Sequence, residues 1–427
     1  MPNAQQYQTG ALMAKAIKKT LSDATVGFNF MSPEVKVFQS VDKDEIDISL
    51  REMLFPVDLN ETGGVAIVQD FGKLARPSVT GLEEGTGFVR HLNKRFNEST
   101  LVRLVNKSSA AQVVDNFKFK AMKSVKAINK RVALMWWGSS SGIMALTNTD
   151  ITAALSQEIT LLSAFGVASL GTPGYLADMF VNSDASGNEG DGVAVVLSGV
   201  TVLGTGIVTA KNRITGTITI QFEAAPTASV VDGLAIVLNN GIGSTLAQTD
   251  FNQALPGWTD CLTVAGLHGI THQEWLPAVY NTSAVRFSPL LWQQGRDEAE
   301  MRGDATISHL FWDAAVKRDA WDNRSTLQRF NDTAMFSLDG DIKAKNVTNI
   351  VSRFVPPSWV TGFDRSKAAR RLQVTPDMPE NGTGGLTQDG GKDYIDEAGR
   401  VSELNHIIGL QWRNRRATVG WTNKTRS

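Results

Sequence analysis

The chain has 427 residues, enough for two or three domains that each bury a core. Its 42 Lys and Arg residues balance 43 Asp and Glu residues, so any contact with nucleic acid must come from local clustering of charge. A single cysteine, Cys261, excludes an intramolecular disulfide framework and a cysteine-based zinc site. The sequence has no apolar run of the ~18 residues that a membrane-spanning helix needs. Its N-terminal segment lacks the apolar core of a signal peptide, so we expect no membrane contact and a reducing cytoplasm.

The first part of the chain predicts extended, solvated structure. Residues 1 to about 50 carry too few apolar side chains to close a core, and we interpret them as an arm. In residues 62–96, two strand-like runs (Val65–Asp70 and Phe88–Leu92) flank a polar stretch rich in Gly and Pro. This pattern predicts a long hairpin or loop, a kind of segment that usually serves interaction or is disordered.

A long helix is predicted from Ser109 to Trp137, a stretch without Pro or Gly. At 1.5 Å per residue this helix would be roughly 40 Å long. Apolar residues recur every three or four positions and predict one buried face: Val114, Phe117, Ala121, Val125, Ile128, Val132 and Met135. Basic residues fill much of the remaining surface: Lys118, Lys120, Lys123, Lys126, Lys130 and Arg131. This basic stripe is either a solvated helix surface, a subunit interface or a sequence-independent contact with DNA phosphates, and the scarcity of interleaved aromatic residues disfavours single strands.

The remainder of the chain predicts alternating helical and β-rich regions. A Gly/Ser stop at 138–142 precedes a second predicted helix near Asp150–Gly166. Residues 190–240 are rich in Val, Ile, Thr and Gly, and their alternation predicts short antiparallel strands in an inserted β module. Beyond this module, helices are predicted at Arg296–Met301 and His309–Phe330, and strands at Asn349–Phe354, Ile407–Trp412 and Ala417–Trp421.

No residue pattern predicts catalysis, a cofactor or a metal site. His268 and His272 are four residues apart, as in helical zinc sites, but Gly269 stands where the general-base Glu is required. We therefore favour loop or core histidines. Cys261 has no nucleophile signature and is predicted to be a buried thiol.

Three further motifs are interpreted as structural. The glycine clusters at 204–206 and 382–385 lack the context of a phosphate-binding loop and are predicted to be turns. The tripeptide Arg302-Gly303-Asp304 occurs often by chance. An acidic loop does not keep the ligand spacing of a calcium loop and is interpreted as solvated; its carboxylates are Asp389, Asp393, Asp396 and Glu397.

The order of these parts resembles that of tailed-bacteriophage major capsid proteins with the Hong Kong 97-type fold. The resemblance covers nearly the whole chain. The parts that carry it follow in this order: the arm, the long hairpin, the helix ending in ALMWWGSSSGIMAL and the β-rich insert. After the insert come the segment GLHGITHQEW, a helix with the Arg302-Gly303 pair, and the closing strands with RRATVG.

The resemblance implies an α+β chain with a Hong Kong 97-type capsid fold. Its implied parts are an N-terminal arm (1–52), an extended loop (53–106), a peripheral domain with a long spine helix (107–174), a β-rich insertion domain (175–245), an axial domain (246–335), and C-terminal strands that complete the axial and peripheral domains (336–427).

The implied function is that of a structural, non-enzymatic major capsid protein. Such a chain self-assembles into hexamers and pentamers of an icosahedral phage head that encloses double-stranded DNA. The implied partners are further copies, a portal, scaffolding and cement proteins, and packaged DNA without sequence specificity. The implied location is the virion, after assembly in the host cytoplasm.

Three alternatives stay open at this point. Chains that form a cellular encapsulating shell share the fold but tend to be shorter and to lack such an insert. A phage tail or adhesion protein would favour β motifs throughout the chain. A cytosolic enzyme would need a catalytic constellation that the sequence lacks.

Overall fold

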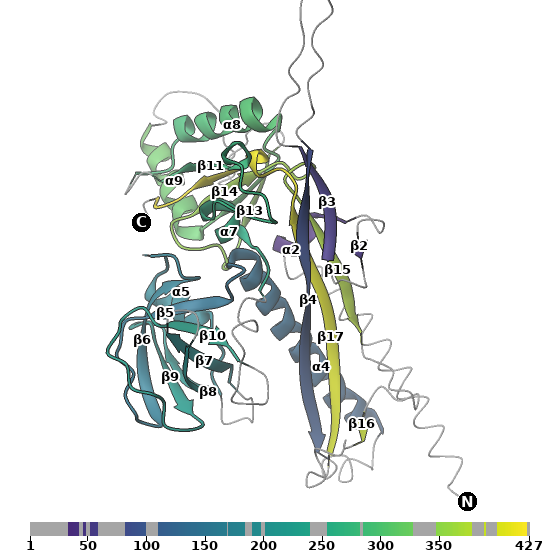
Figure 1. Cartoon of the computed structure of the whole chain (residues 1–427), viewed down its shortest axis with the longest axis vertical. Coiled ribbons are helices and arrows are strands. Elements are labelled where there is room, and N and C mark those ends of the chain that lie inside the picture. The colour runs from purple at the N-terminus through teal and green to yellow at the C-terminus, as the bar shows by residue number, and fades with distance from the viewer. Residues whose placement is uncertain are drawn as a thin grey trace, which may run out of the picture. The chain divides into compact units, whose positions relative to one another are not determined.

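The computed structural model describes residues 33–41, 46–47, 52–58, 82–99, 110–168, 170–183, 190–197, 201–239, 254–281, 285–327, 347–377, 388–389 and 399–424. Helices and strands are mixed in this part of the chain, which confirms the predicted α+β class (Figure 1). The chain divides into two compact units. Unit 1 combines residues 1–52, 88–133 and 371–410, and unit 2 combines residues 53–87, 134–370 and 411–427.

A seven-stranded sheet contains the longest strands (Figure 1). Its order is β1 (Gln39–Ser40), β15 (Ala369–Asp377), β17 (Gly399–Trp412), β4 (Leu82–Ser99), β3 (Glu52–Asp58) and β2 (Ile46–Asp47), with β16 (Gln388–Asp389) paired to β17. β4 and β17 form an antiparallel ladder that runs from Gly399 opposite Ser99 to Gly409 opposite Val89. With 18 residues, β4 is roughly 60 Å long at about 3.4 Å per residue. The predicted strand Phe88–Leu92 is one part of β4, and the predicted strand Val65–Asp70 lies outside the described residues.

The predicted long helix is confirmed as α4 (Ala110–Trp137), which has 28 residues. Of its predicted apolar face, Val125, Ile128 and Val132 are buried and Met135 is half-buried. The side chains of the earlier members of that face lie outside the described set. Among the described residues, no helix is both long and apolar enough to cross a membrane.

The end of α4 is fixed by a second helix, α7 (Trp258–Thr263). The last carbonyl groups of a helix lack partners within the helix. Thr259 of α7 donates from its hydroxyl to the carbonyl oxygen of Trp137 at 2.5 Å. A Cβ at Gly257 would lie 2.5 Å from the carbonyl oxygen of Trp136, so only glycine allows this close approach.

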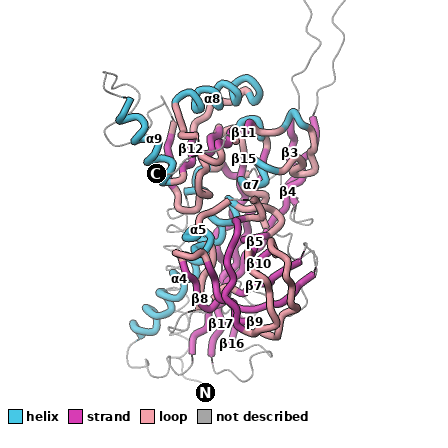
Figure 2. The backbone as a smooth tube through the Cα atoms, turned by 90° about the vertical axis from the view of Figure 1, so that its left-hand side faces the viewer, coloured by secondary structure: helices cyan, strands magenta, loops and turns pink. Residues whose placement is uncertain are grey.

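The β-rich region forms a closed antiparallel barrel, drawn in magenta in Figure 2. Its strands follow one another in the order β10 (Ala235–Leu238), β5 (Ile143–Thr147), β6 (Ser156–Ala164), β9 (Thr217–Phe222), β8 (Thr201–Asn212) and β7 (Gly192–Leu197). Its interior is packed with branched side chains that are fully buried, among them Val195 opposite Ile236 and Val208 opposite Ile220. The barrel therefore combines β5 and β6, from the expected peripheral domain (107–174), with β7 to β10, from the expected insertion domain (175–245).

Two local predictions in this region are wrong. The segment predicted as a helix near Asp150–Gly166 contains β6 instead. Ile159, Leu161 and Ser163 alternate in burial along β6, which pairs with β5 and β9. This pairing satisfies the backbone and outweighs helix propensity.

The glycines at 204–206 do not form a turn but lie inside β8. A Cβ at Gly206 would lie 2.4 Å from the carbonyl oxygen of Gln221, so the barrel wall needs glycine there. The cluster at 382–385 lies outside the described residues.

A five-stranded sheet forms the core of the C-terminal half. Its order is β11 (Ala278–Tyr280), β18 (Thr418–Trp421), β14 (Val360–Phe363), β12 (His309–Trp312) and β13 (Thr348–Val351). Every residue of β14 and β18 is buried, so both faces of the sheet are covered. On one face Phe311 and Phe363 stack at 5.4 Å, and Trp258 of α7 contacts Phe363 at 5.4 Å.

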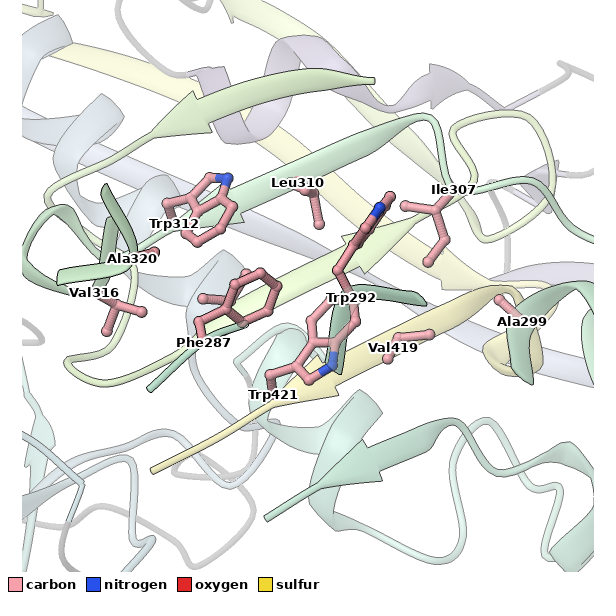
Figure 3. Packing of buried hydrophobic residues seen from close by; sticks show 11 residues of the cluster. Phe287, Trp292, Ala299, Ile307, Leu310, Trp312, Val316, Ala320, Val419 and Trp421 are labelled. Carbon is pink, nitrogen blue, oxygen red and sulfur yellow. The ribbon is translucent and has the colours of Figure 1, made fainter. Parts of the chain in front are cut away.

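The other face is covered by α8 (Pro289–Gly303) and α9 (Ala314–Leu327). Figure 3 shows Phe287 between Trp312 and Trp421, with ring centroids 4.8 and 5.3 Å away. A Cβ at Gly295 of α8 would lie 2.2 Å from Cζ2 of Trp421. The glycine therefore allows α8 to approach the sheet closely.

The predicted helix His309–Phe330 is wrong at its start, whereas the predicted helix Arg296–Met301 lies within α8. Residues His309–Trp312 form β12, and α9 begins only at Ala314. Asp313 separates the two elements because its carboxylate accepts from the backbone nitrogen of Ala315 at 3.3 Å and of Ser358 at 2.9 Å. The predicted strand Ile407–Trp412 is confirmed within β17, and Ala417–Trp421 is confirmed as β18 apart from its first residue. Of the predicted strand Asn349–Phe354, only residues 349–351 lie in a strand, β13.

The boundaries between the two units do not fall in loops. They fall within β3, β4, α4, β15 and β17. Ordinary domain boundaries lie in exposed, flexible linkers. Here the chain passes from one unit to the other along regular elements.

Candidate functional site

The basic stripe on α4 is the predicted site that the structure describes in part. Lys123 and Lys126 are exposed, and Lys130 and Arg131 are half-buried. The side chains of Lys118 and Lys120 lie outside the described set. The two exposed lysines lie away from the buried face of α4, as in any amphipathic helix. That buried face is formed by Val125, Ile128 and Val132.

A second cluster, which the sequence did not reveal, surrounds Arg415. This guanidinium is fully buried and donates to backbone carbonyl oxygens at the end of α7. It reaches Cys261 at 2.5 Å, Val264 at 2.6 Å, and, at longer range, Asp260 and Ala265. The carbonyl groups at the end of a helix carry partial negative charge, so they compensate the buried cation.

The remaining face of Arg415 is covered by an aromatic ring. The guanidinium carbon lies 5.1 Å from the ring centroid of Trp275, a cation–π contact. The nearby thiol of Cys261 is fully buried, and this burial raises its pKa to about 11. The prediction of a buried thiol at Cys261 is confirmed.

His268 connects three separate segments of unit 2. Its Nδ1 lies 3.0 Å from the carbonyl oxygen of Thr86 in β4, and its Nε2 accepts from the backbone nitrogen of Trp412 in β17 at 3.1 Å. This second bond leaves Nδ1 as the donor to Thr86, which defines a neutral imidazole. Burial lowers the pKa of His268 to about 4, and Phe55 of β3 packs on the ring edge-on at 5.2 Å.

The backbone at His268 turns sharply. His268 and Gly269 have φ angles of 56° and 85°, and Leu267 and Ile270 exchange backbone hydrogen bonds on either side of them. This is a tight turn with two left-handed residues. It places His268 in the core and leaves His272 on the surface, 2.7 Å from Oε1 of Glu83 in β4.

The two histidines are thus loop and core residues, as predicted, and both contact β4. Among the described residues, no group of three or more His, Cys, Asp and Glu side chains is placed to hold a metal ion. Of the predicted acidic loop, the structure describes only Asp389, in β16.

The Arg302-Gly303-Asp304 tripeptide closes α8. Arg302 pairs with Glu298 at 3.3 Å. Gly303 is buried, and a Cβ there would lie 2.7 Å from the backbone of Arg416. Asp304 is a left-handed cap, and its hydrogen bond with Lys367 lowers the pKa of the Asp304 carboxyl. All three residues therefore have a structural role.

Arg415 was missed, and the contacts of His268 were not predicted, because the partners of both residues are backbone groups far away in the chain. The pair Arg415-Arg416 reads as an ordinary basic dipeptide. The only local signal was the LHGITH stretch, in which a histidine followed by glycine is typical of a left-handed turn.

No protein-family model matches the sequence, and no curated protein matches it. Solved structures are similar to most of the chain. The cyanophage A-1(L) capsid asymmetric unit has a TM-score of 0.49 and 8% identity, and covers 91% of this chain and 92% of its own. A chain of Mycobacterium phage Ogopogo has a TM-score of 0.42 and 10% identity, and covers 92% of both chains.

A third similar structure, the capsid of the native GTA particle, has a TM-score of 0.43 and 8% identity, and covers 91% of this chain and 89% of its own. Two of these three solved structures are named as capsids. At such identities the likeness concerns the fold alone, and no residue role is transferred from it.

Proposed function

We propose that this chain is the structural subunit of a phage-type capsid. In this proposal, copies self-assemble into hexamers and pentamers of an icosahedral head that encloses double-stranded DNA. The portal, scaffolding and cement proteins are its further partners, and assembly takes place in the host cytoplasm. The parts implied by the sequence resemblance, with their boundaries, belong to the same proposal.

The observation that carries the proposal is the length of β4 and β17 relative to their neighbours. β4 has 18 residues, but β3, its neighbour on the side away from β17, has 7. β17 has 14 residues, but β15 beside it has 9. Among the described strands, both long strands therefore keep stretches of edge without a full-length partner.

Such edges are unstable in a solitary protein. Unpaired strand edges invite pairing with another chain, and a long two-stranded ladder is marginal in water. A shell in which neighbouring copies cover one another's extended elements removes this problem. A compact monomeric enzyme gains nothing from strands roughly 60 and 50 Å long.

The alternatives are separated by architecture. A tail or adhesion protein would repeat its β modules, whereas the described residues form one closed barrel and two sheets of different strand order. A cellular encapsulating shell would assemble in the same way but would enclose protein cargo in place of a genome. The nucleic-acid content of the particles distinguishes these two shells.

Negative-stain electron microscopy of the purified chain, with and without a co-expressed scaffolding protein, tests the proposal. Closed particles with hexameric and pentameric capsomers are expected. A protein that stays a monomer or a compact trimer under every assembly condition would rule the proposal out. Particles purified from infected or producing cells should carry double-stranded DNA.

We propose that the basic stripe of α4 faces packaged DNA or a neighbouring copy. Replacing Lys123, Lys126 and Lys130 with Gln distinguishes the two. If the stripe faces DNA, the variant forms particles with reduced DNA filling, because fewer phosphates are neutralised. If assembly itself fails, the stripe lies at a subunit interface.

A further inference from the structure

One end of the barrel is an apolar surface. It is formed by two loops, residues 148–155 before β6 and residues 223–234 before β10, and we call it the barrel-end surface. Val230 is 84% exposed, and Leu155 and Val231 are each 50% exposed. Its other exposed apolar residues are Ala153, Ala154, Ala224, Ala225 and Ala228.

The two loops are held in one conformation by hydrogen bonds. Ile151 and Ser229 exchange backbone bonds of 2.8 Å in both directions, which joins the loops directly. The backbone nitrogen of Phe222 donates to the carbonyl oxygen of Leu155 at 2.7 Å. The side chain of Gln157 donates to the carbonyl oxygens of Thr152 and Ala154. The exposed apolar side chains therefore stand on an ordered backbone, and docking on them costs little conformational entropy.

The charged residues of the two loops all have one sign. Asp150, Glu223 and Asp232 are exposed there, and neither loop contains Lys, Arg or His. A surface with carboxylates and without cations repels DNA and anionic lipid headgroups. The apolar centre and acidic rim instead fit a protein surface with apolar and basic side chains.

The barrel-end surface is small, because five of its eight exposed apolar residues are alanines. Apolar patches on soluble proteins are typically about 300–600 Å² at most, and a stable pairwise interface needs about 800 Å² on each partner. The barrel is closed, so it offers no strand edge to enlarge the contact. A contact of this size is weak alone and becomes effective when many copies are already held in register.

We propose that the barrel-end surface docks against a neighbouring copy of this chain in the assembled shell. This inference rests on the proposed function. The same chain carries the complementary charge, since its net charge is close to zero and exposed cations such as Lys126 lie elsewhere on it. A separate soluble partner would gain too little from one patch to remain bound at ordinary concentrations.

A thiol-specific probe tests the inference. Cys261 is buried, so Val230→Cys introduces the one thiol expected to be accessible in the folded chain. Ile214→Cys is the matched control, because Ile214 is 89% exposed in the turn between β8 and β9, at the far end of β9. Each variant is labelled with bimane, and quenching by iodide is compared before and after assembly of the purified chain.

The expected result is at least a fivefold drop in the quenching constant at position 230 on assembly, with little change at position 214. Particles in which both labels stay equally accessible would overturn the inference and leave the proposed function intact. Shielding that occurs only when another protein is added would overturn it in favour of a different partner. If no particles form, the proposed function fails, and this inference fails with it.

A second variant measures the energetic effect. Leu155→Glu with Val230→Glu places two charges on the surface, and both residues are exposed, so folding should be unaffected. The protein concentration needed for assembly should rise at least tenfold relative to Ile214→Glu. Equal assembly of the two variants would contradict the inference.

Discussion

The buried guanidinium of Arg415 allows a quantitative test of how unit 2 is held together. Arg415→Met keeps an unbranched side chain of similar length but removes the donors. The carbonyl oxygen of Cys261 then loses bonds of 2.5 and 3.1 Å from Nη2 and Nε. The carbonyl oxygen of Val264 loses a bond of 2.6 Å. Asp260 is affected less, because its carbonyl oxygen also accepts from the backbone nitrogen of Val264 at 3.1 Å.

The magnitude follows from these contacts. A buried acceptor left without a donor costs about 1–3 kcal/mol. This cost applies in full to the carbonyl group of the buried Cys261 and in part to that of Val264, which is 38% exposed. Loss of the contact with Trp275 adds up to about 1 kcal/mol. Removing a desolvated charge offsets part of this sum. We expect the free energy of unfolding of unit 2 to fall by about 3 kcal/mol, which lowers its melting temperature by roughly 5–10 °C. Arg415→Lys should cost about half as much, because one ammonium group cannot reach all these oxygens at once.

Tryptophan fluorescence measures this unit selectively. The chain has ten tryptophans, and the sequence places all of them within residues 134–370 and 411–427, which belong to unit 2. Urea unfolding followed with excitation at 295 nm therefore reports unit 2 without a contribution from unit 1. Far-UV circular dichroism, recorded in parallel, reports both units.

The matched control is Arg213→Met. Arg213 is 70% exposed and pairs with Asp178 at 2.9 Å, and exposed ion pairs contribute at most about 1 kcal/mol. An Arg415→Met variant that unfolds within about 0.5 kcal/mol of the unchanged protein would refute the reasoning. So would an Arg415→Lys variant that is less stable than Arg415→Met.

Three further predictions follow from single contacts. Burial lowers the pKa of His268 to about 4, against ~6.5 in the unfolded chain. Between these pKa values the folded state binds fewer protons than the unfolded chain. The free energy of unfolding should therefore fall by about 3 kcal/mol as the pH drops from about 6.5 to about 4. In urea titrations at several pH values, His268→Asn should show a weaker dependence of the unfolding free energy on pH. Gly295→Ala should destabilise unit 2 by about 2–3 kcal/mol because its Cβ would lie 2.2 Å from Trp421, whereas Gly174→Ala, 3.5 Å from its nearest neighbour, should be close to neutral in the same assay. The thiol of Cys261 should not react with Ellman's reagent at pH 8 in the folded chain but should titrate as one thiol per chain in urea, because burial raises its pKa to about 11.

Periodicity in the sequence predicted the elements whose cause is local. The apolar residues of α4 repeat at helical spacing, and the helix is found at the predicted position. Prediction failed where pairing with a distant strand decides the structure. β6 reads as a helix by itself, yet Ala164 lies opposite Ala145 of β5, and Ser156 lies opposite Gln221 of β9. The apolar residues of β12 were assigned to the following helix for the same reason, because β12 is defined by its pairing with β13 and β14.

The contacts that could not be predicted from the sequence are hydrogen bonds from side chains to backbone groups. Their backbone partners explain both what these side chains do and why no sequence pattern reveals them. Within unit 2, residues 257–272 hold the long elements at the point where each enters this unit. Thr259 binds the end of α4, and His268 binds β4 and β17. Arg415, just beyond β17, fixes the end of α7 within the same segment.

A carbonyl or amide partner is present whatever side chain its residue carries, so these contacts leave no pattern of paired residue types along the sequence. In the proposed shell, the long strands and the long helix would meet neighbouring copies. Forces on these elements would then reach their junction, the contacts of residues 257–272 with α4, β4 and β17. We therefore expect Arg415→Met to weaken assembled particles by at least the amount that it destabilises the isolated chain, which heating of intact particles in a light-scattering assay would measure. Particles of this variant as heat-stable as those of the unchanged protein would show that the junction carries no force in the shell.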